Sequence, residues 1–236
     1  MTLGDPADVD LSTLTVLQVP DNGRTPVSGE LRAAQERAVE HLASLGARIE
    51  RPHFKLLERS YDLWGAALHA HGTHSFSELL GDGHKVNGLY EVLRWAAGAS
   101  PHTLPAILLA AFEWSADFPR GRGDRFLTMA EQLRTELHEA LGDHGVMLYP
   151  SYARTAPPHY QPLLRPFQWV YTAILNVLHV PATQVPMGLD RKGLPLGLQV
   201  VAAPGRDDLT IAVALELERA FGGWVPPAIL RRGSAA

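Results

Sequence analysis

Three histidines close together in the chain, His69, His71 and His74, are the side chains best suited to binding a metal ion. Their offsets of two and five residues do not place three imidazoles on one helical face, which requires spacings of three or four residues. We therefore favour a solvated loop over a metal centre. The sequence contains no cysteine, which excludes disulfides, thiolate metal sites and a cysteine nucleophile together. We expect neither a metal nor any other cofactor.

Nucleophilic chemistry has few candidates in this sequence. The chain has three lysines, Lys55, Lys85 and Lys192, and no two of its serines are adjacent. A G-x-S-x-G nucleophile elbow, a phosphate-binding P-loop and a complete G-x-G-x-x-G are all missing. The tripeptide Arg122-Gly123-Asp124 spells an adhesion motif, but we interpret it as a turn followed by a helix cap.

The bulk composition narrows the classes of partner. The 236 residues are 46% hydrophobic, enough to build the core of one large or two small domains. A formal net charge of -4 provides no basic excess to neutralise phosphates, so we expect no nucleic acid partner. The first residues show no secretory signal pattern, and no apolar run approaches the roughly 20 residues that span a bilayer. We expect a cytoplasmic protein without a membrane span.

The fold that positions these side chains begins with a strand, a helix and a second strand. Residues 14–19 form a β-branched apolar run that ends at Pro20-Asp21-Asn22-Gly23, as a buried strand followed by a turn does. Ser28 is suited to cap the next helix. Residues 47–50 then predict a short second strand. This order predicts a βαβ crossover and a sheet with parallel pairs. The apolar positions of the helix keep a helical spacing up to Gly46: Leu31, Ala34, Ala38, Leu42 and Leu45.

From Leu56 to Gly142 the pattern predicts helices alone. Breaks at residues 81–83, 98–101 and 119–123 divide the stretch into about four helices, and Asp124 is suited to cap the last one. Two of these helices have a clear apolar stripe, formed by Leu104, Ile107, Ala111, Trp114 and Phe118 in one and by Phe126, Ala130, Leu133, Leu137 and Leu141 in the other.

Strand character returns at residues 146–150. A loop rich in proline and aromatic residues, 151–166, then leads into a helix that starts near Pro166 and ends before Pro181. Residues 182–187 and 196–202 predict two strands around a turn at residues 190–193. Asp207 or Asp208 is suited to cap a final helix that runs through Phe221 and stops at Gly222. The helix that starts near Pro166 places on one face Phe167, Val170, Tyr171, Ile174 and Leu178.

The segment from Leu148 to Pro226 carries an ordered set of short motifs. In this order they resemble the closing segment of amidase-signature enzymes, and the full run is similar to bacterial members named as fatty-acid amide hydrolase-like. Residues 11–50 also resemble the strand and helix that follow the catalytic core of that family, so the resemblance covers the chain, more loosely between residues 51 and 143. The motifs are Tyr149-Pro150-Ser151, Thr155-Ala156-Pro157, Asn176, Val180-Pro181-Ala182-Thr183-Gln184-Val185-Pro186-Met187-Gly188, Gly193-Leu194-Pro195-Leu196-Gly197-Leu198-Gln199-Val200-Val201, Gly205-Arg206-Asp207-Asp208 and Ala214-Leu215-Glu216-Leu217-Glu218.

The resemblance implies an α/β fold, a partial mixed β-sheet flanked by helices that forms the C-terminal portion of the amidase-signature fold. We divide the chain into a leader of residues 1–10 and the C-terminal part of an amidase domain, residues 11–236, with the helical stretch 56–142 within it. The glycines and prolines of the motifs are mostly architectural. Gln199 is expected to bond buried backbone groups rather than to act in catalysis.

The resemblance also implies a catalytic set that this chain lacks. In amidase-signature enzymes a neutral lysine acts as base through one serine, a second serine attacks the amide carbonyl, and N–H groups of a glycine-rich loop hold the oxyanion. That segment precedes the region matched by Leu11. Here none of the three lysines is followed by a loop rich in glycine and serine. We predict no catalytic residue in this chain and no amide hydrolysis by the chain alone.

Five residues are the candidate substrate-binding group, because in the family the loop and helix after this strand border the acyl and amide pocket. They are Tyr152, Thr155, Phe167, Trp169 and Asn176. The alternative is that the aromatic side chains of this group fill the core, since aromatic residues at helical spacing usually pack there.

Three explanations remain open for a chain of this kind. It is part of a split amidase whose complementary N-terminal fragment supplies the catalytic residues, an inactive remnant, or a binding protein that reuses the amidase scaffold. A partial sheet exposes unpaired edge groups, so we expect either pairing with the complementary fragment or self-association through that edge. A small amide would be the substrate only of the completed protein.

Overall fold

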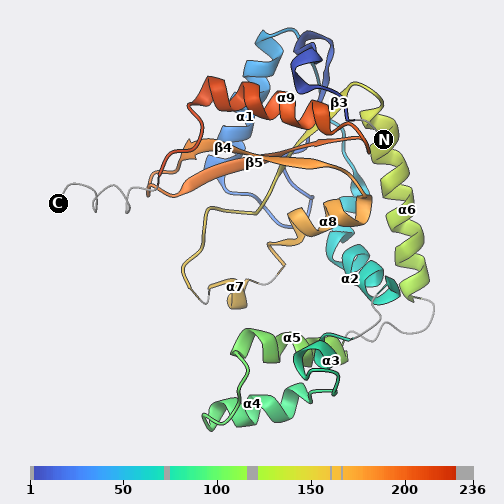
Figure 1. Ribbon diagram of the computed structural model, residues 1–236, viewed down its shortest axis with the longest axis vertical. Helices are drawn as coiled ribbons and strands as arrows, with labels where there is room; N and C mark the ends of the chain where they lie inside the picture. Colours follow the sequence, from blue (N-terminus) through green and yellow to red (C-terminus); the bar gives the residue numbers. More distant parts are fainter. Residues whose placement is uncertain (1–2, 72–74, 116–121, 160, 166, 227–236) are drawn as a thin grey trace, which may run out of the picture. The chain divides into compact units, whose positions relative to one another are not determined.

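The computed structural model describes residues 3–71, 75–115, 122–159, 161–165 and 167–226. Its centre is a five-stranded mixed sheet in the order β2-β1-β3-β5-β4 (Figure 1). The strands are β1 (Thr15–Gln18), β2 (Arg48–Glu50), β3 (Gly145–Pro150), β4 (Ala182–Leu189) and β5 (Pro195–Ala202). β1 runs parallel to both β2 and β3, whereas β5 runs antiparallel to β3 and β4. The predicted mixed α/β sheet is confirmed.

The strand, helix and strand at the start of the chain form the predicted parallel crossover. α1 (Gly29–Ser44) buries the apolar stripe read from the sequence, and only Leu45 lies past its last turn. Ser28 is the N-cap by position, but its side chain makes no capping hydrogen bond. Gly46 has a φ of +101°, a conformation that glycine adopts without steric cost, and this lets the chain leave the helix and enter β2.

Helices cover both faces of the sheet. α1 and α9 (Asp207–Phe221) lie on one side of it and α8 (Val170–Leu178) lies on the other (Figure 1). Thr183 of β4 donates a hydrogen bond to Thr210 of α9 at 2.8 Å, which fixes that strand to its helix. On the opposite face the rings of Tyr149 and Tyr171 lie 5.3 Å apart. β3 is buried along its whole length because both layers cover it.

The chain divides into two compact units. One contains residues 1–64 and 129–236 and includes the sheet, and the other contains residues 65–128. The predicted all-helical stretch holds the short 3₁₀ helix Lys55–Arg59 and, among the described residues, five α-helices rather than about four. They are α2 (Ser60–His71), α3 (Phe76–Leu80), α4 (Gly88–Ala96), α5 (Leu104–Ser115) and α6 (Arg122–Leu141).

Three predicted helix starts are wrong in detail. α6 begins at Arg122, so Asp124 lies in its first turn instead of capping it. Likewise Arg206 is the N-cap of α9, and Asp207 and Asp208 lie in its first turn. α8 begins at Val170 instead of near residue 166, because Phe167 has a φ of 77° and cannot continue a helix. Phe167 is 38% exposed and leaves the buried face to the other four predicted residues. Phe118, residues 119–121 and Pro166 lie outside the described residues.

α4 has its polar side buried and its apolar side exposed. Glu91 is 5% exposed and accepts hydrogen bonds from Arg94 at 2.8 Å and from Ser100 at 2.7 Å. Leu89 and Leu93 are instead 62% and 70% exposed. This arrangement is the reverse of the usual pattern for a surface helix.

No helix of the described residues is long and apolar enough to cross a membrane.

Gln35 links α1 to the two central parallel strands, and its removal should destabilise the sheet. Its buried amide donates to the carbonyl of Val19 at 3.0 Å and to that of Leu148 at 2.7 Å. In Gln35→Leu, which keeps the size of the side chain, both acceptors lose this donor. We expect the free energy of unfolding to fall by about 1–3 kcal/mol. Glu40→Ala, at an exposed position of the same helix, is the control in urea denaturation, and equal effects of the two changes would contradict the prediction.

Candidate functional site

The carboxyl ends of β1 and β3 lie side by side at the centre of the sheet. From β1 the chain crosses to β2 on one side, whereas β3 pairs with β1 on the other. This is a topological switch point, because the connections of neighbouring strands lead in opposite directions. In open α/β sheets a crevice for ligands forms at such a point, outside the carboxyl ends of the strands. The loops that follow β1 and β3 are therefore the candidate site.

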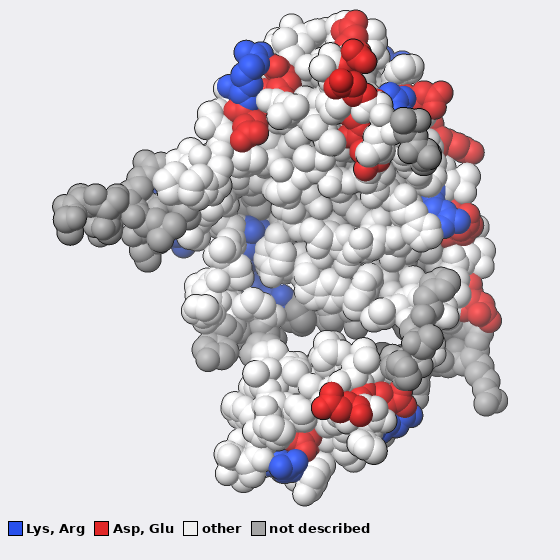
Figure 2. Space-filling model, viewed as in Figure 1, with Lys and Arg blue, Asp and Glu red and all other residues white. Residues whose placement is uncertain are grey.

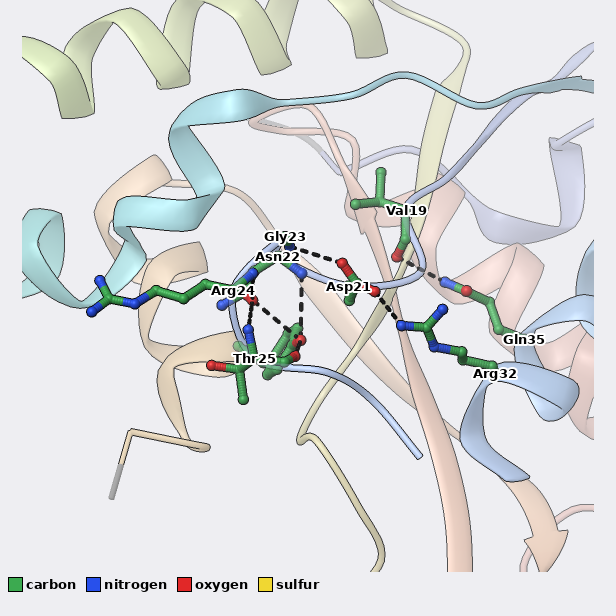
Figure 3. Close-up of polar contacts among 9 residues, drawn as sticks. Val19, Asp21, Asn22, Gly23, Arg24, Thr25, Arg32 and Gln35 are labelled. Atoms are coloured by element: carbon green, nitrogen blue, oxygen red, sulfur yellow. Dashed lines mark hydrogen bonds and ion pairs between the residues drawn. The ribbon is translucent and has the colours of Figure 1, made fainter. Parts of the chain in front are cut away.

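The loop after β1 is held by its own side chains (Figure 3). The Asn22 carboxamide oxygen accepts hydrogen bonds from the backbone N–H of Arg24 at 3.1 Å and of Thr25 at 2.8 Å. Asp21 accepts from the Gly23 N–H at 2.8 Å and pairs with Arg32 of α1. These bonds form the type of Asx turn that the Pro-Asp-Asn-Gly sequence favours.

The hydroxyl group of Tyr171 in α8 anchors the loop after β1. Its hydroxyl donates to the Thr25 carbonyl and accepts from the Asn22 N–H at 3.4 Å. Burial raises the pKa of Tyr171 far above its ordinary value, so the hydroxyl stays protonated and able to donate.

Tyr149 of β3 lies next to Tyr171 and is completely buried. Burial raises the pKa of Tyr149 well above its ordinary value. Its hydroxyl has no hydrogen-bond partner among the described residues, which is unusual for a buried polar group.

The end of β3 and the loop after it are tied to three other elements. The Ser28 N–H, just before α1, donates to the Ala153 carbonyl at 2.8 Å. The predicted role of Gln199 is confirmed, since its amide donates to the Pro150 carbonyl at 3.0 Å. Thr155 donates to Asp190 in the turn between β4 and β5 at 2.9 Å. Although burial opposes ionisation, hydrogen bonds from the Leu194 N–H, the Thr155 hydroxyl and the Lys192 N–H keep the pKa of Asp190 below its ordinary value.

An aromatic cluster contains two of the five predicted substrate-binding residues. The ring of Phe167 lies 4.3 Å from that of Tyr61, and Trp169 lies 6.2 Å from Tyr61 and 4.6 Å from Trp64. α2 thus supplies half of the cluster, and the segment just before α8 supplies the other half. Such edge and tilted contacts are the favourable geometries for aromatic rings.

No ring contact or hydrogen bond among the described residues joins the other three predicted residues to this cluster. Tyr152 and Thr155 are half-buried in the loop after β3, where burial raises the pKa of Tyr152 and the nearby Arg154 opposes that rise. Asn176 is exposed on α8, and its backbone carbonyl accepts from the His179 N–H at 3.3 Å. The substrate-binding role of all five residues stays a prediction.

Sequence reasoning missed Tyr149, Arg154 and Tyr171 as members of this region. Tyr149 belongs to one of the family motifs, and Tyr171 belongs to a predicted buried helix face. Neither pattern indicates which partner the tyrosine hydroxyl contacts. Arg154 is half-buried, and its Nε atom has no hydrogen-bond partner among the described residues.

A small cavity adjoins the loop after β1. It is lined by residues 19–23 on one side and by residues 52–54 and Leu57 on the other, and its volume is about 80 Å³. Pockets that hold drug-sized ligands measure about 300–1,000 Å³, so this cavity is too small to be such a pocket.

Metal ligands and an amine base are the remaining chemical groups to place in the described part of the chain. Within that part of the chain no group of three or more histidine, aspartate or glutamate side chains could hold a metal ion. His74 lies outside the described residues. Lys55, Lys85 and Lys192 are all exposed, whereas a lysine base has to be removed from water to stay neutral.

The comparisons with known proteins agree on one family. The family model described as Amidase matches residues 6–211. Human fatty-acid amide hydrolase 2 is 44% identical over 208 residues, which are 85% of this chain and 39% of that protein. Fatty-acid amide hydrolase 2-B of Danio rerio is 40% identical over 233 residues, 94% of this chain and 44% of that protein. The chain thus spans about two-fifths of the length of these curated relatives.

Solved structures match the fold at lower identity. A bacterial aryl acylamidase of the amidase signature family superposes with a TM-score of 0.64 at 19% identity, and the match covers 88% of this chain and 44% of that enzyme. A 6-aminohexanoate cyclic dimer hydrolase gives a TM-score of 0.60 at 19% identity, and the match covers 98% of this chain and 50% of that enzyme.

Removal of the two tyrosine hydroxyls should have unequal effects on the free energy of unfolding. Tyr171→Phe loses the bonds that anchor the loop after β1, and we expect the free energy of unfolding to fall by about 1–2 kcal/mol. Tyr149→Phe deletes a buried hydroxyl that has no described partner, so we expect no loss or a slight gain in stability. Urea denaturation of both variants measures this. A loss in Tyr149→Phe as large as that in Tyr171→Phe would contradict the assignment.

The stability of the chain should fall as the pH rises above about 10. Because burial raises the pKa of Tyr149 and Tyr171 in the folded chain, these hydroxyls lose protons at lower pH in the unfolded chain. Their contribution is complete below the ordinary tyrosine pKa and is lost above it. Urea denaturation between about pH 8 and about pH 11 measures the slope, which should be shallower in the double variant Tyr149→Phe/Tyr171→Phe. An unchanged slope would overturn this attribution.

Proposed function

The chain belongs to the amidase family, and on that premise we propose that it forms the C-terminal part of an amide-bond hydrolase that is inactive without its catalytic segment. One observation carries this proposal. The family match extends over residues 6–211, yet the matched region accounts for only 39–44% of the relatives' length, and the chain lacks a Ser-Ser pair. The hydrolytic activity of the family therefore needs groups that this chain does not supply.

The chemistry of amide cleavage supports the same conclusion. A serine nucleophile needs an adjacent base, and a lysine serves as that base only when its environment keeps it neutral. All three lysines of this chain are exposed. We propose that the base, the bridging serine and the nucleophile come from the segment that precedes this region in the family.

The contribution of this chain to the completed enzyme would be part of the substrate pocket. The aromatic cluster of Tyr61, Trp64, Phe167 and Trp169 offers an apolar wall, suited to the acyl or aryl portion of an amide. Tyr152, Thr155 and Asn176 are proposed to border the same pocket. The names of the human and Danio rerio relatives point to fatty-acid amides as the first substrates to examine.

The free edge of β4 is the proposed docking edge for the complementary segment. β2, at the other edge, has three residues and carries the ion pair of Arg48 and Glu50, and both features protect an edge from pairing. β4 has eight residues, none of them charged, and pairs only with β5 among the described residues. Pro186 and the register shift between Pro186 and Leu189 protect its second half, so residues 182–185 are the unprotected stretch. In the absence of its complement we expect the same edge to mediate self-association. The lack of cysteine suits a cytoplasmic location.

Complementation tests the proposal directly. The chain is co-expressed with a separate segment that carries the family's Lys-Ser-Ser set, and the purified complex is assayed with an aryl amide and a fatty-acid amide. We expect hydrolysis by the complex only, and its loss when the nucleophilic serine of the added segment is changed to alanine.

The controls are each partner alone and the complex with the serine variant. Hydrolysis by this chain alone, lost on replacing one of its own serines, would show that it carries its own catalytic group. A stable complex without activity would favour a binding role for the scaffold.

A further inference from the structure

Two buried side-chain polar atoms in the described part of the chain lack a hydrogen-bond partner, and both flank the carboxyl end of β3. They are the hydroxyl oxygen of Tyr149, in the strand, and Nε of Arg154, in the loop that follows it. Buried polar groups in folded proteins are nearly always hydrogen-bonded, and those that are not call for a missing partner. Both groups carry a hydrogen to donate, so the missing partner is an acceptor.

The other half-buried arginines show what Arg154 lacks. Arg94 pairs with Glu91 at 2.8 Å, Arg206 pairs with Asp208 at 3.0 Å, and Arg134 pairs with Glu131. Arg154 is also half-buried, but no hydrogen bond or ion pair joins it to any described residue. A guanidinium nitrogen that is buried without an acceptor is unfavourable, and a planar carboxylate matches the geometry of the whole guanidinium best.

The loop that carries Arg154 is held in place from both sides. The bond from the Ser28 N–H to Ala153 fixes it beside the start of α1, and the bond from Thr155 to Asp190 fixes it to the turn between β4 and β5. Arg154 therefore lies between two anchored residues. The positive end of the α1 dipole adds to the preference for an anion, because no Ser28 side-chain hydrogen bond caps this helix.

We propose that Arg154 binds a carboxylate of the substrate, so that the amide cleaved by the completed enzyme carries an acidic group in addition to an apolar portion. This inference rests on the proposed function and narrows its substrate class. The apolar portion lies against the aromatic cluster, and the carboxylate accepts hydrogen bonds from the Arg154 guanidinium. An N-acyl amino acid has both parts joined by the amide bond itself.

Ligand binding to the chain tests the inference separately from hydrolysis. N-Decanoylglycine and its methyl ester share the amide and the acyl chain and differ in the carboxylate. Isothermal titration of each against the 236-residue chain should show the acid binding about tenfold more tightly than the ester. Arg154→Gln should remove this preference, and Arg154→Lys should keep part of it. Arg219→Gln, at an exposed arginine of α9, should leave it unchanged.

The same two ligands, assayed as substrates of the complemented enzyme, distinguish failure of the carboxylate inference from failure of the proposed hydrolase function. If the complex hydrolyses amides but wild type treats acid and ester alike, the inference is wrong and the proposed function stands. If no complex is active but the chain binds the acid through Arg154, the carboxylate site stands and the hydrolase assignment fails. If Arg154→Gln weakens assembly and lowers kcat/KM for acid and ester equally, the partner of Arg154 is a carboxylate of the added segment, which overturns the inference. Absence of acid binding to wild type also overturns it.

Discussion

The parallel pairing of β1 with β3 is the constraint on which the rest of the molecule depends. These strands are joined by 126 residues of intervening chain, between Gln18 and Gly145, and each is buried against helices. A strand buried on both faces requires a layer on each side, which α1 and α9 supply on one face and α8 on the other. Gln35 reinforces the pairing, because one amide group donates to carbonyls at the end of both strands. The two loops of the candidate site are neighbours only as a result.

The polar groups at this end of the sheet divide into satisfied and unsatisfied sets. Tyr171 and Asn22 bond to each other and to the backbone of the loop after β1, so they rigidify it. Tyr149 and Arg154, on the neighbouring strand and loop, lack such partners among the described residues. Unsatisfied polar groups are costly in a core and useful in a binding site, where a ligand supplies the missing bond. Arg154 is half-buried and follows the carboxyl end of β3, which supports the second interpretation for this group, whereas Tyr149 is completely buried.

The surface also carries features that a self-sufficient domain usually avoids. β4 presents an uncharged edge, and α4 presents Leu89 and Leu93 to solvent while it buries Glu91. In Figure 2 the charged side chains of the unit that contains the sheet gather toward its top and right, and its middle carries few. These properties agree with a chain that spans about two-fifths of the length of its relatives. In the proposed complete enzyme the edge of β4 would be paired.

The strands and most of the helices could be predicted from local sequence patterns, because an apolar run or stripe has to be buried in any tertiary arrangement of the chain. The crossover of residues 14–50, the strand before Pro150 and the amide role of Gln199 were all readable in this way. The residues at which helices start were harder to predict from the sequence. Asp124, Asp207 and Asp208 lie within the first turns of their helices, and α8 starts later than predicted because Phe167 has a left-handed backbone conformation. The sequence motifs also determined the family. Only the tertiary structure placed Tyr61 and Trp64 against Phe167 and Trp169, and only it left Tyr149 and Arg154 without partners among the described residues. Contacts between residues far apart in the chain depend on how the layers pack, and no local pattern encodes where a hydroxyl or guanidinium finds its acceptor.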